Sequence, residues 1–182
     1  MAAIPAGVPG TEIRRERPDD APSIRALVDA AFAPSTLEGR IVDALRAGDR
    51  WLADYALVAV DASGSIVGYV VTSLGDLRTP DGSVGPILAL GPLAVAPSAQ
   101  GQGIGGALMR ATIAIAIEQG WPVIVLLGHD TYYPRFGFES ARALGIEPPE
   151  PWDDKHWMAL RLPAWTPDLR GTMYYPAAFD ID

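Results

Sequence analysis

The residues with the clearest capacity for chemistry form a glycine-rich stretch between two apolar runs. Gln100-Gly-Gln-Gly-Ile-Gly-Gly106 contains four glycines and leads into a segment whose apolar residues recur at helical spacing. Because glycine has no Cβ, a backbone rich in it can approach a ligand closely. Free N–H groups and the dipole at a helix N-terminus attract anions. The stretch therefore predicts a site for a phosphate-bearing ligand; the plainer alternative is a turn that packs the helix tightly on a sheet.

The same stretch matches two phosphate-binding patterns. Gly101 to Gly106 fits the G-x-G-x-x-G of dinucleotide-binding folds, and Gln100 to Gly105 fits the Gln-x-x-Gly-x-Gly of acyl-CoA-binding loops. A dinucleotide loop turns directly off its strand, whereas Ala96-Pro-Ser-Ala-Gln100 intervenes here, which favours acyl-CoA. Asp130 stands at about the right distance for a ribose contact, so a dehydrogenase stays as a minor alternative. A P-loop is excluded because no Gly-Lys-Ser/Thr follows.

A second feature, Gly91-Pro92, interrupts the apolar run that precedes the glycines. Proline cannot donate to a β-ladder, so a strand should bulge there and part from its neighbour. If 88–95 and 123–127 are parallel partners, they separate beyond this point. The backbone groups of Leu93, Ala94 and Val95 would then face an open slot, where an extended, amide-containing ligand can pair with them like an added strand.

The third feature is the segment Tyr132-Tyr-Pro-Arg-Phe-Gly-Phe138. It follows an apolar run, at the end of a strand where α/β sheets place their chemistry. We interpret Tyr132, Phe136 and Phe138 as core residues. Tyr133 is adjacent to Tyr132 on a short turn, so we expect it to point the other way, into the slot.

Composition limits the classes of function. A net charge of −8 argues against nucleic acid as a partner, because such binding relies on Lys and Arg to neutralise phosphates. The absence of cysteine excludes disulfides, thiolate metal sites and an acyl-cysteine intermediate, and we expect no metal. No apolar run approaches the ~20 residues of a membrane span. The N-terminal MAAIPAGVPGT is a poor signal peptide, so we expect a cytoplasmic protein.

These features require a sheet and helices to position them. Periodicity predicts strands over 11–17, 56–60, 66–72, 87–95, 123–127 and 157–162, and helices that follow 18, 35 and 103, with a brief helix over 132–136. A right-handed crossover makes 87–95 and 123–127 parallel neighbours. We expect a single α/β (α+β) domain over 1–182, with a mixed sheet of about six or seven strands and about four helices. Residues 1–10 should be flexible, and 141–182 should form an extension packed on the domain.

Together the three features resemble the GCN5-related N-acetyltransferase (GNAT) superfamily. Gln100-x-x-Gly-x-Gly105 resembles its acetyl-CoA pyrophosphate loop, Leu93 to Val95 its bulged strand, and Tyr133-x-x-x-Gly-Phe138 its terminal motif. Within the superfamily, Leu144-Gly-Ile-Glu-Pro-Pro-Glu150 and Gly171-Thr-Met-Tyr-Tyr-Pro-Ala-Ala-Phe179 are similar to the YhbS-like branch of predicted acetyltransferases.

The resemblance implies that acetyl-CoA is the co-substrate and that an amine attacks its thioester directly in a ternary complex. The acceptor would be a small amine or a peptide. The backbone N–H of Val95 would polarise the thioester carbonyl, and Tyr133 would act as general acid toward the departing sulfur. The residues implied in acetyl-CoA binding are Leu93, Ala94, Val95, Gln100, Gly101, Gln102, Gly103, Ile104, Gly105 and Gly106.

The chain departs from the family pattern at the general base. Many members carry an acidic residue on the bulged strand, but 87–95 has no titratable side chain. His129 is a candidate base, because imidazole titrates near neutrality, although a lone histidine is more often structural. The missing carboxylate also leaves open a catalytically silent acyl-CoA sensor or scaffold.

The acceptor pocket is the least defined part of the prediction. We expect residues 32–40, the loop 75–86 and the segment with Trp152 and Trp157 to build it, with Trp157 in the core. The tail, rich in proline and aromatic residues, could dock on a second copy of the chain in a homodimer.

Overall fold

The computed structural model describes Ile4 and residues 7–181. The predicted flexibility of residues 1–10 falls partly on 1–3 and 5–6, which lie outside the described residues. Ile4 and Val8, which are described, pack against the hydrophobic core.

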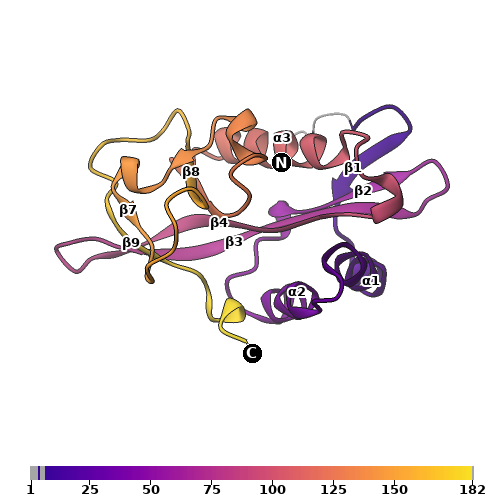
Figure 1. Ribbon diagram of the computed structural model, residues 1–182, viewed down its shortest axis with the longest axis horizontal. Coiled ribbons are helices and arrows are strands. Elements are labelled where there is room, and N and C mark those ends of the chain that lie inside the picture. Colours follow the sequence, from indigo (N-terminus) through magenta and orange to yellow (C-terminus); the bar gives the residue numbers. More distant parts are fainter. Residues whose placement is uncertain (1–3, 5–6, 182) are drawn as a thin grey trace.

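A single mixed sheet runs through the molecule, in the strand order β1-β2-β3-β4-β5-β8-β6, with β9 paired to both β3 and β7 (Figure 1). The strands are β1 Thr11–Arg15, β2 Ala56–Asp61, β3 Ile66–Arg78, β4 Val84–Val95, β5 Val123–Leu127, β6 Glu139–Ser140, β7 Ile146–Glu147, β8 Trp157–Arg161 and β9 Gly171–Tyr174. Nine strands among the described residues compare with the predicted six or seven; the additional ones, β6, β7 and β9, lie after residue 138, where the sequence predicted only β8.

Two helices lie on one face of the sheet and one on the other (Figure 1). They are α1 Ala21–Phe32, α2 Leu37–Ala47 and α3 Ile104–Glu118. Of the about four predicted helices, three are these α-helices, and the brief one over 132–136 forms as the 3₁₀ helix η4, Tyr133–Phe136. α3 is apolar on most of its surface, and it packs on the sheet in the main core. Phe138, which follows η4, belongs to the same core.

The predicted loop over 75–86 is wrong. β3 continues to Arg78 and β4 begins at Val84, so the two strands form one long hairpin. β4 is an edge strand at this end, where a proline is tolerated, and Pro86 pairs there with Asp76. On the other side of β3, Asp76 to Arg78 pair with β9. The extension 141–182 is therefore part of the sheet as well as packed on it.

The parallel strands β4 and β5 separate as predicted. Only Leu88 with Ile124 and Ala89 with Val125 are paired between them. Beyond these pairs β4 bulges. Leu90 and Leu93 of β4, three residues apart, pair with residues of β3 that are only two apart, so β4 contains one extra residue. Gly91 has a φ of 139°, a backbone angle that favours glycine. The bulge carries the end of β4 away from β5 and opens a slot between them.

Candidate active site

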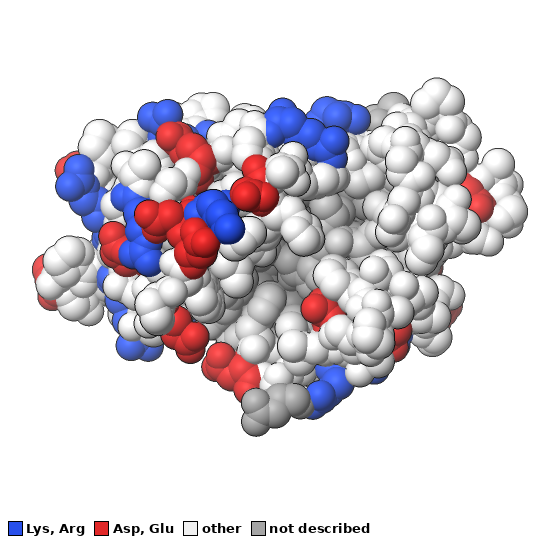
Figure 2. Space-filling view, viewed as in Figure 1, with Lys and Arg blue, Asp and Glu red and all other residues white. Residues whose placement is uncertain are grey.

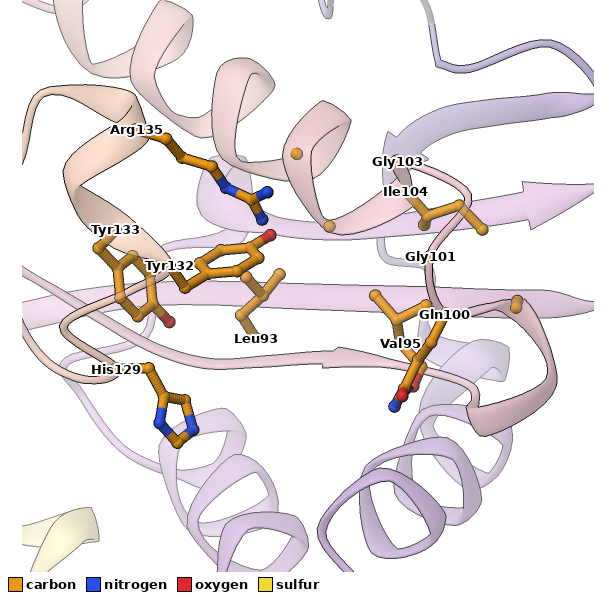
Figure 3. A pocket seen from close by; sticks show the side chains of 13 residues that line it. Leu93, Val95, Gln100, Gly101, Gly103, Ile104, His129, Tyr132, Tyr133 and Arg135 are labelled. Carbon is orange, nitrogen blue, oxygen red and sulfur yellow. Dashed lines mark hydrogen bonds between the residues drawn. The ribbon is translucent and has the colours of Figure 1, made fainter.

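The slot is a cavity of about 540 Å³ between the separated strands and the start of α3. Figure 3 shows Val95, Gln100 and Ile104 on one side of it, and Tyr132, Tyr133 and Arg135 on the other. The glycines Gly101, Gly103, Gly105 and Gly106 all line the cavity, as do Leu93, Val95 and His129. The structure thus brings together most of the residues that the sequence selected.

Backbone groups of two β4 residues point into the slot. Ala96 N–H donates to Val67 O at 2.9 Å, which places Ala96, and by strand alternation Ala94, toward β3. The same alternation turns the N–H and C=O groups of Leu93 and Val95 away from β3, toward the slot. The backbone groups of Ala94 point toward β3 and not into the slot, contrary to the prediction. Its side chain is buried on the face of the sheet that α1 and α2 cover.

The glycines form an open nest before α3. Gly101 and Gly103 have φ angles of 77° and 83°, which only glycine adopts without strain. Nothing lies within 4 Å of the Cβ position at Gly101. Because Gly103 is the N-cap of α3, the first N–H groups of the helix follow directly and are free to bind an anion. The alternative of a packing turn alone does not require this open space.

The two glutamines of the nest hold the backbone with their side chains. Gln100 Nε2 donates to Val95 O at 3.2 Å and thereby ties the loop to the end of β4. Gln102 Nε2 donates to Ser98 O at 3.4 Å, and Gln102 is not among the residues that line the slot. Ala99, which the sequence did not single out, lines it instead.

Tyr133 lies where the slot meets a second cavity, and lines both. Its ring packs over Gly128, where a Cβ would come within 2.3 Å of Tyr133 Cε2, so only glycine fits there. An edge contact with Phe138, 5.7 Å between ring centres, supports the ring from another side. Burial, and then the neighbouring Tyr132, raise the pKa of Tyr133 to about 12, so its hydroxyl stays protonated at neutral pH.

Tyr132 is not the buried core residue that we expected. It packs only partly against the core and lines the slot, with its hydroxyl directed at the start of α3 (Figure 3). A Cβ on Gly105 would meet that hydroxyl at 2.6 Å. Phe136 is likewise only partly buried, whereas Phe138 is in the core as predicted. The side chain of Tyr132 faces the slot because η4 turns both tyrosines toward it.

Arg135 is a slot residue that the sequence analysis missed. Its guanidinium lies 3.8 Å from the centre of the Tyr132 ring, a cation–π contact that holds it over the slot. Arg110, one turn along α3 from Gly106, borders an adjoining depression with Arg135. Arg135 is the one cation of the Tyr132–Phe138 segment, and this could have been the signal. Two arginines beside the nest add positive charge to its backbone N–H groups.

The second cavity has a volume of about 960 Å³ and shares Leu93, His129 and Tyr133 with the slot. Phe32 and Glu38 from the predicted 32–40 region line it, as does Trp152. The 75–86 segment does not line it; Tyr174 and Tyr175 of the C-terminal segment do. Trp157 is fully buried, as expected, and its indole N–H donates to Ile146 O at 2.9 Å.

Two features are absent from the residues that the structure describes. No helix among them has the length and apolar character to cross a bilayer. Within the same part of the chain, no three histidine, cysteine or acidic side chains gather as metal ligands would.

Comparison with known proteins agrees with this geometry. Residues 53–140 match the family model described as an acetyltransferase (GNAT) domain. The uncharacterized N-acetyltransferase YhbS of Escherichia coli K12 is 38% identical over 129 residues, which cover 71% of this chain and 74% of YhbS.

Two solved structures are similar over nearly the whole chain. The crystal structure of Escherichia coli YhbS in complex with CoA has a TM-score of 0.83 at 30% identity, covering 100% of this chain and 97% of that one. A GNAT family acetyltransferase from Brucella melitensis, in complex with acetyl-CoA, has a TM-score of 0.75 at 36% identity, covering 93% and 98%. With the slot, the nest and the sequence identity in agreement, the chain belongs to the GNAT acetyltransferase superfamily, among its YhbS-like members.

Proposed function

We propose that this protein transfers the acetyl group of acetyl-CoA to a primary amine, by direct attack within a ternary complex. The observation that carries the proposal is the separation of β4 and β5 in front of the glycine nest. The slot offers backbone N–H and C=O groups to an amide-containing arm, and the nest offers N–H groups to a diphosphate. The two CoA-bound relatives support the same assignment, because their chains superpose on this one along almost their full length.

In the proposed reaction the amine nitrogen attacks the thioester carbonyl carbon, and the C–S bond then breaks. Val95 N–H, which faces the slot, would donate to the carbonyl oxygen as it becomes negative. Such an oxyanion contact is typically worth about 2.7–4 kcal/mol. Leu93 would pair with the pantetheine arm, and the N–H groups from Gly101 to Gly106, assisted by Arg135, would bind the diphosphate. These residues belong to the proposal because their positions fit acetyl-CoA.

Tyr133 would assist the departure of the sulfur. We predicted a general acid here, and a hydroxyl that stays protonated is available to donate. With a pKa of about 12, against about 8.5 for a thiol, full proton transfer to the thiolate is uphill by about 5 kcal/mol. Tyr133 would therefore act mainly by hydrogen-bonding the thiolate.

The incoming ammonium must lose a proton before it attacks. His129 lines both the slot and the second cavity and is solvent-exposed, so it can pass a proton to water. We keep it as the proposed base, in place of the carboxylate that many members of the superfamily carry on the bulged strand. A cytoplasmic location stays part of the proposal, and a homodimer remains a prediction for size-exclusion chromatography.

The test is a screen of amines with acetyl-CoA, in which release of CoA thiol and the mass of the acetylated product are both measured. We expect acetylated product from at least one class of amine, and thermal stabilisation by acetyl-CoA but not by NAD. Stabilisation by CoA with no transfer to any amine would favour the sensor alternative. Stabilisation by NAD alone would overturn the assignment in favour of the dehydrogenase.

A further inference from the structure

The second cavity opens onto the slot at Leu93, His129 and Tyr133. If the acetyl group lies beside Tyr133, as the proposed function requires, an acceptor must reach it from this cavity. The chemistry of the cavity walls then defines the class of acceptor. This inference rests on the proposed function and extends it to the substrate.

Charge divides the two cavities. Glu38, Glu150 and Asp180 line the second cavity, and no lysine or arginine does so among the described residues. The slot has the opposite character, with Arg135 and the helix N-terminus facing it. An acceptor with a carboxylate or a phosphate would meet like charge at these three residues, whereas a cation is attracted to them.

Figure 2 shows the charged side chains on one face of the molecule. A hollow lies near the middle of the face; red side chains lie at its lower border, red and blue side chains lie together to its upper left, and a group of blue side chains gathers at the upper edge.

Aromatic rings form the rest of the wall. Trp152 and Tyr175 have ring centres 6.3 Å apart, and Phe179 lies 4.4 Å from Tyr175, so the three rings form a continuous apolar surface. Aromatic faces bind alkyl chains by apolar contact and attract ammonium groups through the ring quadrupole. The wall therefore suits a cation with an apolar segment better than a heavily hydroxylated molecule.

One carboxylate of the cavity and its aromatic wall are held in place before any acceptor binds. The Ser35 hydroxyl donates to Glu38 Oε2 at 2.7 Å, which orients that half-buried carboxylate at the start of α2. The Tyr175 hydroxyl accepts from Leu127 N–H at 3.0 Å and so fixes the aromatic wall to the end of β5. A fixed wall can discriminate between acceptors, because little ordering is left to do on binding.

We propose that the acceptor is a flexible diamine or oligoamine, in which an apolar chain joins the reacting amine to a second cationic group. The reacting amine lies near Leu93, His129 and Tyr133. The alkyl chain lies along the aromatic wall, and the second ammonium is bound among Glu38, Glu150 and Asp180. Monoamines fill the same reacting position but bring no second cation to the carboxylates.

Three acceptors with the same number of carbon atoms test this directly: 1,5-diaminopentane, pentylamine and 5-aminopentanoate. We expect kcat/KM to fall in that order, with the diamine at least about tenfold above pentylamine from carboxylate and ring contacts combined. Two equivalent amines account for only twofold of this difference. A diamine preference of twofold or less, or 5-aminopentanoate as the best of the three, would overturn the proposal.

Matched variants locate the effect. Glu38→Gln should lower the ratio of kcat/KM for the diamine to kcat/KM for pentylamine, mainly because KM for the diamine rises. Glu118→Gln removes the same charge from the exposed end of α3, outside the cavity, and should leave the ratio as in the wild type. If both variants lower this kcat/KM ratio equally, only the net charge of the protein matters, which contradicts the proposal.

Binding separates this inference from the proposed function. With CoA present, thermal stabilisation of the protein by the diamine should exceed that by pentylamine, and Glu38→Gln should reduce the excess. Absence of transfer to every amine would refute the proposed function, while this binding difference would still support the acceptor class. Equal stabilisation by the two amines would overturn the acceptor class, even if transfer occurs.

Discussion

Replacing Tyr133 with phenylalanine removes one hydroxyl from the junction of the two cavities and leaves the ring. The contacts of that ring with Phe138 and with the surface of Gly128 need no oxygen, so the fold should be retained. A hydrogen bond to a charged group such as a thiolate contributes about 1.5–3 kcal/mol. The variant should therefore lose about 10- to 150-fold in kcat. Loss of an obligatory proton transfer would be much larger.

The assay measures kcat and KM by CoA-thiol release with a saturating amine, and acetyl-CoA affinity by equilibrium binding. The affinity should stay within about threefold of the wild type, because the hydrogen bond forms only as the sulfur departs. Since burial raises the pKa of Tyr133 to about 12, its ionisation should produce no loss of wild-type activity below pH 10. Unchanged kcat would refute the donor role, and an equal fall in affinity and kcat would show that Tyr133 binds the substrate ground state.

Further predictions concern the glycines and alkaline stability. Gly101→Ala and Gly64→Ala each place a side chain at a positive φ in open space, so each should lose about 1–2 kcal/mol in unfolding free energy. Only Gly101→Ala should weaken acetyl-CoA binding, by tenfold or more. Equal acetyl-CoA affinities of the two variants in binding titrations would contradict a role of the nest in binding. Gly128→Ala should displace the Tyr133 ring and lower kcat as much as Tyr133→Phe does. In the same assay, the kcat of the double variant should be no lower than that of either single variant. Finally, unfolded tyrosine ionises near 10 but Tyr133 only near its folded pKa of about 12, so the protein should lose stability as pH rises through this window. Between pH 8 and pH 11, the unfolding free energy measured in urea should fall by about 1 kcal/mol less in Tyr133→Phe than in the wild type. An equal fall in both proteins would contradict the burial of the hydroxyl.

Features that depend on local chemistry could be predicted from the sequence. The break at Gly91-Pro92 and the nest at Gly101 to Gly106 follow from backbone properties of glycine and proline, which act within a few residues. The start of α3 at Ile104 and its end before Gly120 follow from the same rules.

Features that depend on distant contacts could not be predicted. The extension of β3 beyond Thr72 pairs with β4 on one side and, from Asp76, with β9 on the other, almost a hundred residues later. Gly75 is needed there because a Cβ would lie 2.7 Å from Tyr174 O. The direction of Tyr132 likewise depends on the close approach of its hydroxyl to Gly105. In both cases a glycine marks a partner that no local pattern identifies.

A crystal structure of the protein with acetyl-CoA tests the central claim most directly. We predict that the diphosphate lies within hydrogen-bonding distance of the N–H groups from Gly101 to Gly106. The pantetheine arm should pair with Leu93 and Val95 between β4 and β5, with the sulfur beside the Tyr133 hydroxyl. Acetyl-CoA bound outside the slot, or a diphosphate away from the glycine nest, would contradict the account.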